Sequence, residues 1–123
     1  MIKLIASDLD GTALNGGKLS DKNKAAIQKA VDAGIEFVVS TGRALYAVPK
    51  DFYDIKEFKY AITCNGACLC NVRTGEVLRK YKVETDDVKN LIAISRKYNV
   101  TFEVFTGGHR GHIDKKYHED PVK

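Results

Sequence analysis

Short apolar runs, each ending in polar or glycine-containing residues, recur in the first half of the chain. They are Ile2 to Ala6, Ile35 to Ser40 and Tyr60 to Cys64. Runs of this length, rich in β-branched and aromatic side chains, are typical of strands buried in a parallel sheet. The pattern therefore predicts three strands, and at or just beyond their carboxyl ends stand Asp8-Leu9-Asp10, Thr41-Gly42-Arg43 and Asn65-Gly66.

Between these runs the apolar positions follow a helical spacing. Ser20 is a favourable N-cap, Gly34 ends the segment, and the apolar stripe between them consists of Ala25, Ala26, Ile27, Ala30 and Val31. A second helix is predicted to begin near Ala44, and Pro49 either kinks or restarts it because proline removes a backbone donor. This order predicts an α/β fold with a Rossmann-like, doubly wound parallel sheet, whose ligands lie outside the carboxyl ends of the strands.

Turn residues predict two hairpins. Asn15-Gly16 lies between apolar flanks and is a strong tight-turn signal. Arg73-Thr74-Gly75 joins two predicted strands, Ala67 to Asn71 and Glu76 to Val83.

The pattern changes after the second hairpin. Thr85 is placed to cap a helix with acidic residues in its first turn, and its apolar side consists of Val88, Leu91, Ile92, Ser95 and Tyr98. Val100 to Phe105 alternates and predicts a half-buried strand. Residues 106–123 show no periodicity, so we expect a loop or disorder there.

The composition is that of a soluble globular protein. The 123 residues are 44% hydrophobic and 29% charged, which favours one compact domain. No stretch approaches the roughly 18 uncharged apolar residues of a membrane helix, and the first residues lead directly into a strand rather than a signal peptide. The formal charge of +4 is spread among acidic residues, so it gives little support to nucleic-acid binding. We expect a cytoplasmic protein that binds neither membrane nor nucleic acid.

Two groups of residues offer potential metal ligands. The cysteines are Cys64, Cys68 and Cys70, and the histidines are His109, His112 and His118. The cysteines crowd one strand and turn, so we interpret them as reduced, small buried side chains, with structural zinc as the alternative. The histidines lie in the unpatterned C-terminal stretch, where solvated loop residues are favoured over a metal site.

Asp8 and Asp10 carry the most informative chemistry. Side chains two residues apart at a strand end project the same way, and adjacent carboxylates repel unless a proton, a cation or amide donors lie between them. A hard divalent cation such as Mg²⁺ suits a site that also takes a phosphate. The alternative is a surface turn, since Asp and Gly are common turn residues.

The string Asp8-Leu9-Asp10-Gly11-Thr12 resembles the first motif of the haloacid dehalogenase superfamily. Thr41-Gly42-Arg43 is similar to its second motif, and Asn65-Gly66-Ala67 is similar to a loop of its Cof-type phosphatases. The resemblance implies an incomplete core over residues 1–82, with a small flap after Thr12. Over residues 83–123 it implies the beginning of an α+β cap domain.

The resemblance also implies roles for these residues. Asp8 would attack the phosphate ester of a small metabolite, such as a sugar phosphate, and form an aspartyl-phosphate, while Asp10 would serve as acid and then base. Mg²⁺ would bind the Asp8 carboxylate and the Asp10 main-chain carbonyl. The implied phosphate- and substrate-binding residues are Leu9, Gly11, Thr12, Thr41, Gly42, Arg43, Asn65 and Gly66. The alternatives are a turn role for Thr41 and a surface pair with a carboxylate for Arg43.

The chain departs from the family's pattern because it lacks the third-motif lysine and the acidic Gly-Asp-x-x-Asn-Asp motif. We therefore expect the N-terminal part of a phosphatase, as a fragment or a truncated gene product. Two hypotheses follow. The first is a Mg²⁺-dependent phosphohydrolase, with a phosphomutase as a related activity. The second is a catalytically silent remnant that binds a ligand or forms a homo-oligomer through an exposed sheet edge.

Overall fold

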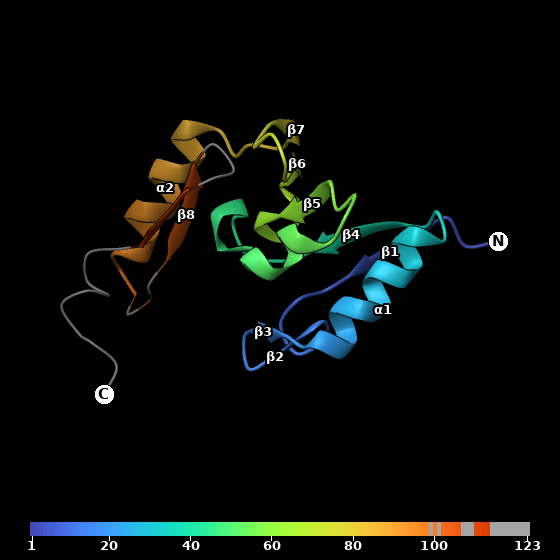
Figure 1. Ribbon diagram of the computed structural model, residues 1–123. Coiled ribbons are helices and arrows are strands. Elements are labelled where there is room, and N and C mark those ends of the chain that lie inside the picture. The colour runs from blue at the N-terminus through green and yellow to red at the C-terminus, as the bar shows by residue number, and fades with distance from the viewer. Residues whose placement is uncertain (99, 101, 107–109, 114–123) are drawn as a thin grey trace.

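A five-stranded mixed sheet forms the centre of the structure, a computed structural model that describes residues 1–98, 100, 102–106 and 110–113. Its order is β1-β4-β5-β6-β7 (Figure 1). These strands are Leu4–Ser7 (β1), Glu36–Ser40 (β4), Tyr60–Thr63 (β5), Cys68–Asn71 (β6) and Val77–Lys80 (β7). The first three are parallel and the last two add the predicted antiparallel hairpin. The α/β, Rossmann-like class is thus confirmed.

The first crossover contains the predicted hairpin and helix. Strands β2 (Leu14–Asn15) and β3 (Lys18–Leu19) pair antiparallel around the Asn-Gly turn. Helix α1 (Asp21–Asp32) begins where the Ser20 hydroxyl accepts a hydrogen bond from the Asn23 N–H at 3.2 Å. The helix ends at Asp32, and the chain turns at Gly34, whose φ of 80° is a conformation that glycine adopts without a steric penalty.

The second crossover corrects the sequence prediction. The helix expected near Ala44 is replaced by two short 3-10 helices, η1 (Leu45–Ala47) and η2 (Lys50–Asp54). Pro49 has no N–H to donate to the Leu45 carbonyl, so the first segment stops after one turn and η2 starts afresh behind the proline. The Phe52 N–H then donates to the Pro49 carbonyl at 3.2 Å, the i to i+3 pattern of a 3-10 helix.

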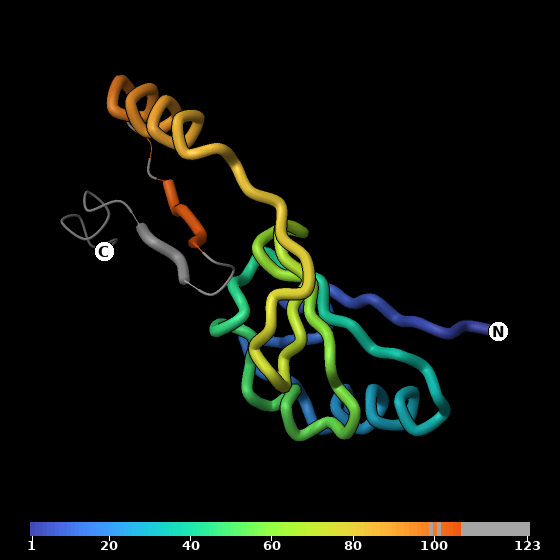
Figure 2. The backbone as a smooth tube through the Cα atoms, turned by 90° about the horizontal axis from the view of Figure 1, so that it is seen from above, coloured from blue at the N-terminus to red at the C-terminus, as the bar shows by residue number. Residues whose placement is uncertain are grey.

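The hydrophobic core lies on one face of the sheet, between the strands and the layer formed by α1, η1 and η2. Phe52 is fully buried there, and its ring centroid lies 6.4 Å from that of Phe37 and 5.6 Å from that of Phe58. Figure 2 shows α1 along this side of the sheet, with α2 and β8 beyond the end of the sheet. Phe52 of η2 therefore packs its ring between those of Phe37 and Phe58 in the core.

Beyond the sheet, α2 (Thr85–Ser95) precedes an antiparallel pair, β8 (Glu103–Thr106) and β9 (Arg110–Ile113). Two expectations are corrected here. Glu84 rather than Thr85 is the N-cap residue, and residues 110–113 form a strand instead of a loop because they find a partner in β8. His109 and His118 lie outside the described residues. The division between residues 82 and 83 stays a prediction.

The cysteines are buried as predicted. Cys64, Cys68 and Cys70 are free thiols, and the last two belong to the hydrophobic core. Burial raises the pKa of the Cys64 and Cys70 thiols. Within the described ranges, no three His, Cys, Asp or Glu side chains gather closely enough to hold a metal ion. None of the described helices has the length and apolar content to cross a membrane.

Arg73 closes one end of the core, a role that its place in a predicted turn did not indicate. Its guanidinium donates to the main-chain carbonyls of Phe58 at 2.8 Å, Tyr53 at 2.8 Å and Ile55 at 2.6 Å. The planar fork of an arginine is suited to reach several acceptors at once. The hairpin turn is thereby tied to the end of η2 and to the segment that follows it.

We expect Arg73→Lys to lower the free energy of unfolding by about 1 to 3 kcal/mol, because a single ammonium group cannot satisfy three separated carbonyls. Urea denaturation measures the change. The matched control is Arg79→Lys, whose guanidinium lies 5.7 Å from the Tyr81 ring on the surface and whose loss should cost less than about 0.5 kcal/mol. Equal losses in the two variants would contradict the role given to Arg73.

Candidate functional site

One pocket of about 480 Å³ brings two of the three predicted loops together. It contains both carboxylates of the first loop and the whole Thr-Gly-Arg turn of the second. Its lining residues are Asp8, Asp10, Thr41, Gly42, Arg43, Ala44, Tyr46, Ala47, Glu103 and Phe105. The pocket lies outside the carboxyl ends of β1 and β4, where a parallel sheet is expected to bind ligands.

The loop after β1 folds so that its aspartates face solvent. Leu9 is fully buried and anchors the loop in the core, and its carbonyl accepts the Leu14 N–H at 2.8 Å. Gly11 turns the chain at a φ of 77°, which lets the loop reverse direction at once. Asp8 and Asp10, on either side of the buried leucine, are both exposed.

Arg43 holds the Asp10 carboxylate with two hydrogen bonds. Its Nε donates to Oδ2 at 2.9 Å and its Nη2 donates to Oδ1 at 2.7 Å, while its Nη1 donates to the Ala47 carbonyl at 2.9 Å. These hydrogen bonds and the positive charge of the guanidinium lower the pKa of Asp10, and the same hydrogen bonds and the negative charge of the carboxylate raise the pKa of Arg43. In this arrangement the Asp10 carboxylate is ionised and fixed.

Asp8 is more available than Asp10. Its carboxylate accepts a long hydrogen bond from the Thr12 hydroxyl at 3.4 Å and makes no other side-chain hydrogen bond in the described structure. Carboxylate oxygens are the donors that Mg²⁺ prefers, so Asp8 fits a metal site. The Asp10 carboxylate fits less well because Arg43 already occupies both of its oxygens, which leaves the main-chain carbonyl that the family resemblance implies.

The second and third loops are locked together by their backbones. The Cys64 N–H donates to the Arg43 carbonyl at 2.9 Å, and the Asn65 N–H donates to the Thr41 carbonyl at 3.2 Å. To make these bonds Cys64 and Asn65 adopt φ values of 52° and 55°, which cost energy for residues with a side chain. The strained backbone at Cys64 and Asn65 therefore holds the turn that positions Thr41 and Arg43.

Asn65 also explains why position 42 is a glycine. A Cβ added to Gly42 would lie 2.7 Å from the Asn65 Oδ1, closer than real Cβ contacts come. The Asn65 carboxamide thus lies against the second loop, beside the pocket although not among its lining residues.

Unused hydrogen-bond donors surround the pocket. The main-chain N–H groups of Asp10 and Gly42 donate to no acceptor within the described residues. The buried Thr41 hydroxyl oxygen accepts the Arg43 N–H at 3.2 Å, which leaves its proton free to donate. Such donors at strand ends are suited to bind the oxygens of a phosphate.

The remaining predicted residues lie apart from the pocket. Leu9 and Gly11 shape the first loop, and Thr12 contacts Asp8. Gly66 lies beside a different hollow, with Ile62 and Leu69. Their phosphate- and substrate-binding roles stay predictions.

Sequence reasoning missed Tyr46, Glu103 and Phe105 at this pocket. Glu103 and Phe105 come from β8, far from the motifs in the sequence. The alternation of residues 100–105 indicated a strand but not which face would turn towards the carboxylates, because that depends on how β8 sits against the sheet.

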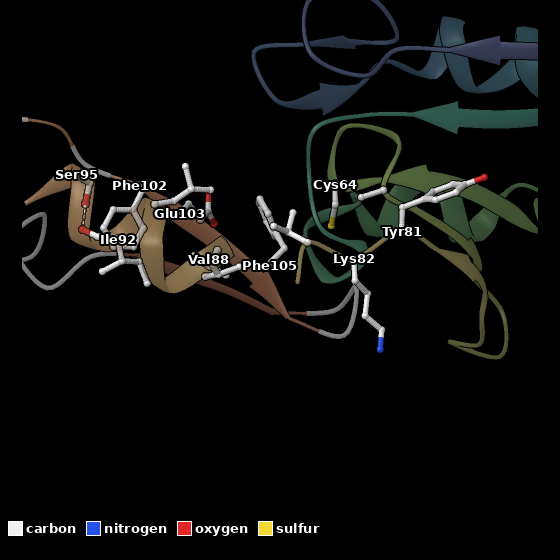
Figure 3. Close-up of a pocket in the computed structure, with 13 residues that line it drawn as sticks. Cys64, Tyr81, Lys82, Val88, Ile92, Ser95, Phe102, Glu103 and Phe105 are labelled. Carbon is white, nitrogen blue, oxygen red and sulfur yellow. Dashed lines mark hydrogen bonds between the residues drawn. The ribbon is translucent and has the colours of Figure 1, made fainter. Parts of the chain in front are cut away.

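A second pocket, of about 510 Å³, is apolar. Figure 3 shows Cys64 and Tyr81 on one side of it and Val88, Ile92 and Phe102 from α2 and the β8 region on the other. Neither aspartate lines it. Since it lacks the two aspartates and offers few polar groups, we place the chemistry in the pocket that contains Asp8.

Comparisons with known proteins agree with this geometry. The family model of haloacid dehalogenase-like hydrolases matches residues 5–122. The chain is 38% identical over 102 residues to the 5-amino-6-(5-phospho-D-ribitylamino)uracil phosphatase YcsE of Bacillus subtilis, a match that covers 82% of this chain and 41% of the relative. It is 39% identical to the phosphatase YwpJ of the same organism, with 86% and 37% of the two chains covered.

Solved structures show the same likeness. A haloacid dehalogenase-like hydrolase from B. subtilis superimposes with a TM-score of 0.75 at 36% identity, covering 86% of this chain and 37% of the other. A HAD-superfamily phosphatase from Bacteroides thetaiotaomicron superimposes with a TM-score of 0.70 at 30% identity, covering 86% and 39%. The chain spans about 40% of the length of the curated relatives it matches.

The left-handed backbone at Asn65 leads to a stability prediction. We expect Asn65→Gly to be more stable than Asn65→Ala by about 1 kcal/mol, because glycine adopts a φ of 55° without the steric cost that alanine meets. Asn90, inside α2, is the matched control, and there the alanine variant should be the more stable one. Chemical denaturation of the four variants tests this, and the same order at both positions would contradict it.

The ion pair leads to a pH prediction. Because the hydrogen bonds and charge of Arg43 lower the pKa of Asp10, Arg43→Gln should raise that pKa towards its ordinary value of 3.8. The contribution of the pair to folding is fully present above the unfolded-state pKa and is lost as the pH falls through the lower folded-state pKa. NMR titration of the Asp10 side-chain carboxyl measures the shift.

The control for this titration is Lys24→Gln, which removes a cation paired with Asp54 at 2.7 Å and should leave the Asp10 titration unchanged. If Asp10 titrates at the same pH in the unaltered chain and in the Arg43→Gln variant, the ion pair does not form in solution.

Proposed function

The chain belongs to the haloacid dehalogenase-like hydrolases, and we propose that its site takes part in Mg²⁺-dependent hydrolysis of a small phosphorylated metabolite through an aspartyl-phosphate at Asp8. The observation that carries the proposal is the single pocket that joins Asp8 and Asp10 to the Thr41 to Arg43 turn. The phosphatase names of the relatives support the reaction class. The substrate class rests on the size of the pocket and on its free donors.

Asp8 is suited to be the nucleophile. Its carboxylate is exposed, belongs to the pocket and is held only by the long contact from Thr12, so one oxygen can approach a phosphorus atom. The Thr41 hydroxyl and the N–H groups of Asp10 and Gly42 would bind the phosphoryl oxygens and stabilise the charge that they carry in the transition state.

Asp10 would serve as acid and base. To protonate a leaving alcohol it must first take a proton, whereas Arg43 lowers its pKa in the present arrangement. A bound phosphate offers Arg43 a second anion, and transfer of the guanidinium towards it would release the Asp10 carboxylate. Arg43 would therefore couple phosphate binding to the availability of the acid.

Mg²⁺ fits the oxygen donors of Asp8 and the Asp10 main-chain carbonyl. When bound there it would neutralise part of the charge that keeps one anion from attacking another. The residues that line the pocket contribute two aspartates and one glutamate, and Arg43 as their cation, within the described part of the chain.

A ligand-binding role without turnover is the second candidate function. It is favoured by one observation, that no lysine side chain lines the pocket within the described residues. A site of this composition would hold a phosphate through Thr41 and Arg43 and yet lack a lysine beside Asp8.

The hydrolase proposal predicts that Asp8→Asn reduces phosphate release from phosphomonoesters by about 10³-fold or more, because an amide is a poor nucleophile. Chelation of Mg²⁺ should have a comparable effect. The measurement is release of inorganic phosphate from a panel of sugar phosphates and other small phosphomonoesters at saturating Mg²⁺.

Asp87→Asn, on the exposed first turn of α2, is the control and should retain full activity. Transfer to a sugar instead of water would identify a mutase. No phosphate release by the unaltered chain, combined with binding of inorganic phosphate that Arg43→Gln abolishes, would favour the ligand-binding function and overturn the hydrolase.

A further inference from the structure

One charged side chain at the pocket has no part in the proposed reaction. Asp8 would attack the ester, and Asp10, which Arg43 holds, would transfer protons, whereas Glu103 of β8 would do neither. Glu103 is exposed, and its side chain makes no hydrogen bond or ion pair with any other residue in the described part of the chain. Its carboxylate is therefore available to a ligand.

The position of β8 places this carboxylate beside the part of a substrate that leaves. Thr41 and Arg43, which would bind the phosphate, follow the carboxyl end of β4. An ester held there has to extend away from the sheet, and β8 lies beyond the end of the sheet (Figure 2) and lines the same pocket. The residues that β8 contributes are Glu103 and Phe105, so the leaving group meets one carboxylate and one aromatic ring.

The protein offers this carboxylate no cation of its own. Glu103 and Phe105 also line the apolar pocket of about 510 Å³, so the two pockets adjoin at β8. Among the described residues, the cations that line the two pockets are Arg43 and Lys82. Arg43 is bound to Asp10, and Figure 3 shows the Lys82 ammonium directed away from Glu103. The negative charge of Glu103 therefore acts on whatever occupies the space beside it.

A lone carboxylate beside the leaving group discriminates between charges. An ionised carboxylate only accepts hydrogen bonds, so it favours a leaving group with hydroxyl, N–H or ammonium donors. It disfavours a leaving group that carries a carboxylate or a second phosphate, because like charges placed side by side repel each other. Since Glu103 is exposed to solvent, which screens its charge, the effect on affinity is moderate.

We propose that Glu103 is a specificity-determining residue, which makes the pocket select phosphomonoesters with a neutral or cationic, donor-bearing leaving group over those with an anionic one. This role rests on the proposed function, because it requires the phosphate to lie at Thr41 and Arg43. It narrows the substrate class to sugar and amino-sugar phosphates, against the phosphates of sugar acids. Glu103 takes no part in bond cleavage, so its effect falls on binding rather than on the chemical step.

Three ligands with a hexose-derived backbone and a terminal phosphate test the selection. Glucosamine 6-phosphate carries an ammonium group, glucose 6-phosphate has no charge beyond its phosphate, and 6-phosphogluconate carries a carboxylate. They are titrated into the Asp8→Asn variant, which lacks the nucleophile and so does not consume them, and the NMR shifts of backbone amides give each dissociation constant. We expect affinity to fall in that order, with about a tenfold difference between the first ligand and the last.

Variants of Glu103 in the same Asp8→Asn background supply the contrast. Glu103→Gln should reduce the difference to less than about twofold, and Glu103→Lys should reverse the order. Inorganic phosphate, which has no leaving group, should bind the Glu103→Gln variant as tightly as before. The matched controls are Glu76→Gln and Glu76→Lys, because Glu76 is exposed in the turn before β7 and lines neither pocket, and both should keep the original order.

All four variants should keep the melting temperature of the Asp8→Asn chain, since both glutamates are exposed. The role of Glu103 is overturned if the three ligands bind equally or not at all, if Glu103→Gln leaves the difference unchanged, or if Glu76→Lys alters the order as Glu103→Lys does. Phosphate release is measured separately on the chain with Asp8 intact. Release without discrimination overturns the role of Glu103 alone, and discrimination without release overturns hydrolysis alone.

Discussion

The parallel pairing of β1, β4 and β5 is the constraint on which the site depends. It brings the ends of three strands to one edge of the sheet, so that loops separated by more than thirty residues in sequence meet. The pairing alone does not orient their side chains. That is done by the backbone bonds from Cys64 to Arg43 and from Asn65 to Thr41, made at the cost of two left-handed residues.

Most of the architecture could be predicted because it is encoded locally. Apolar runs, the Ser20 cap and the Asn-Gly turn each report on a few neighbouring residues, and the three motifs follow directly from the strands. The second crossover could not be predicted, because the same apolar residues suit a helix or a pair of 3-10 turns. Pro49 and the packing of Phe52 against Phe37 decide between them.

Features that rest on distant contacts escaped the sequence. Arg73 acts on carbonyls of residues 53, 55 and 58, which no local pattern links to it. Glu103 reaches the pocket through the placement of a whole strand. Even within the motifs, no local pattern identifies Asp10 as the carboxylate that pairs with Arg43, because the two residues lie 33 positions apart.

That pair changes how the site is understood. Asp10, the proposed acid, is held by a cation that favours its ionised form, and the Arg43 guanidinium is held in turn by the Ala47 carbonyl. In the arrangement with Arg43 bound to it, the Asp10 carboxylate is held ionised and has no proton to donate. Under the proposed function, a phosphate that enters the pocket would compete with Asp10 for the Arg43 guanidinium and so would release the Asp10 carboxylate. Under that proposal, a single side chain, Arg43, would couple substrate binding to the availability of Asp10.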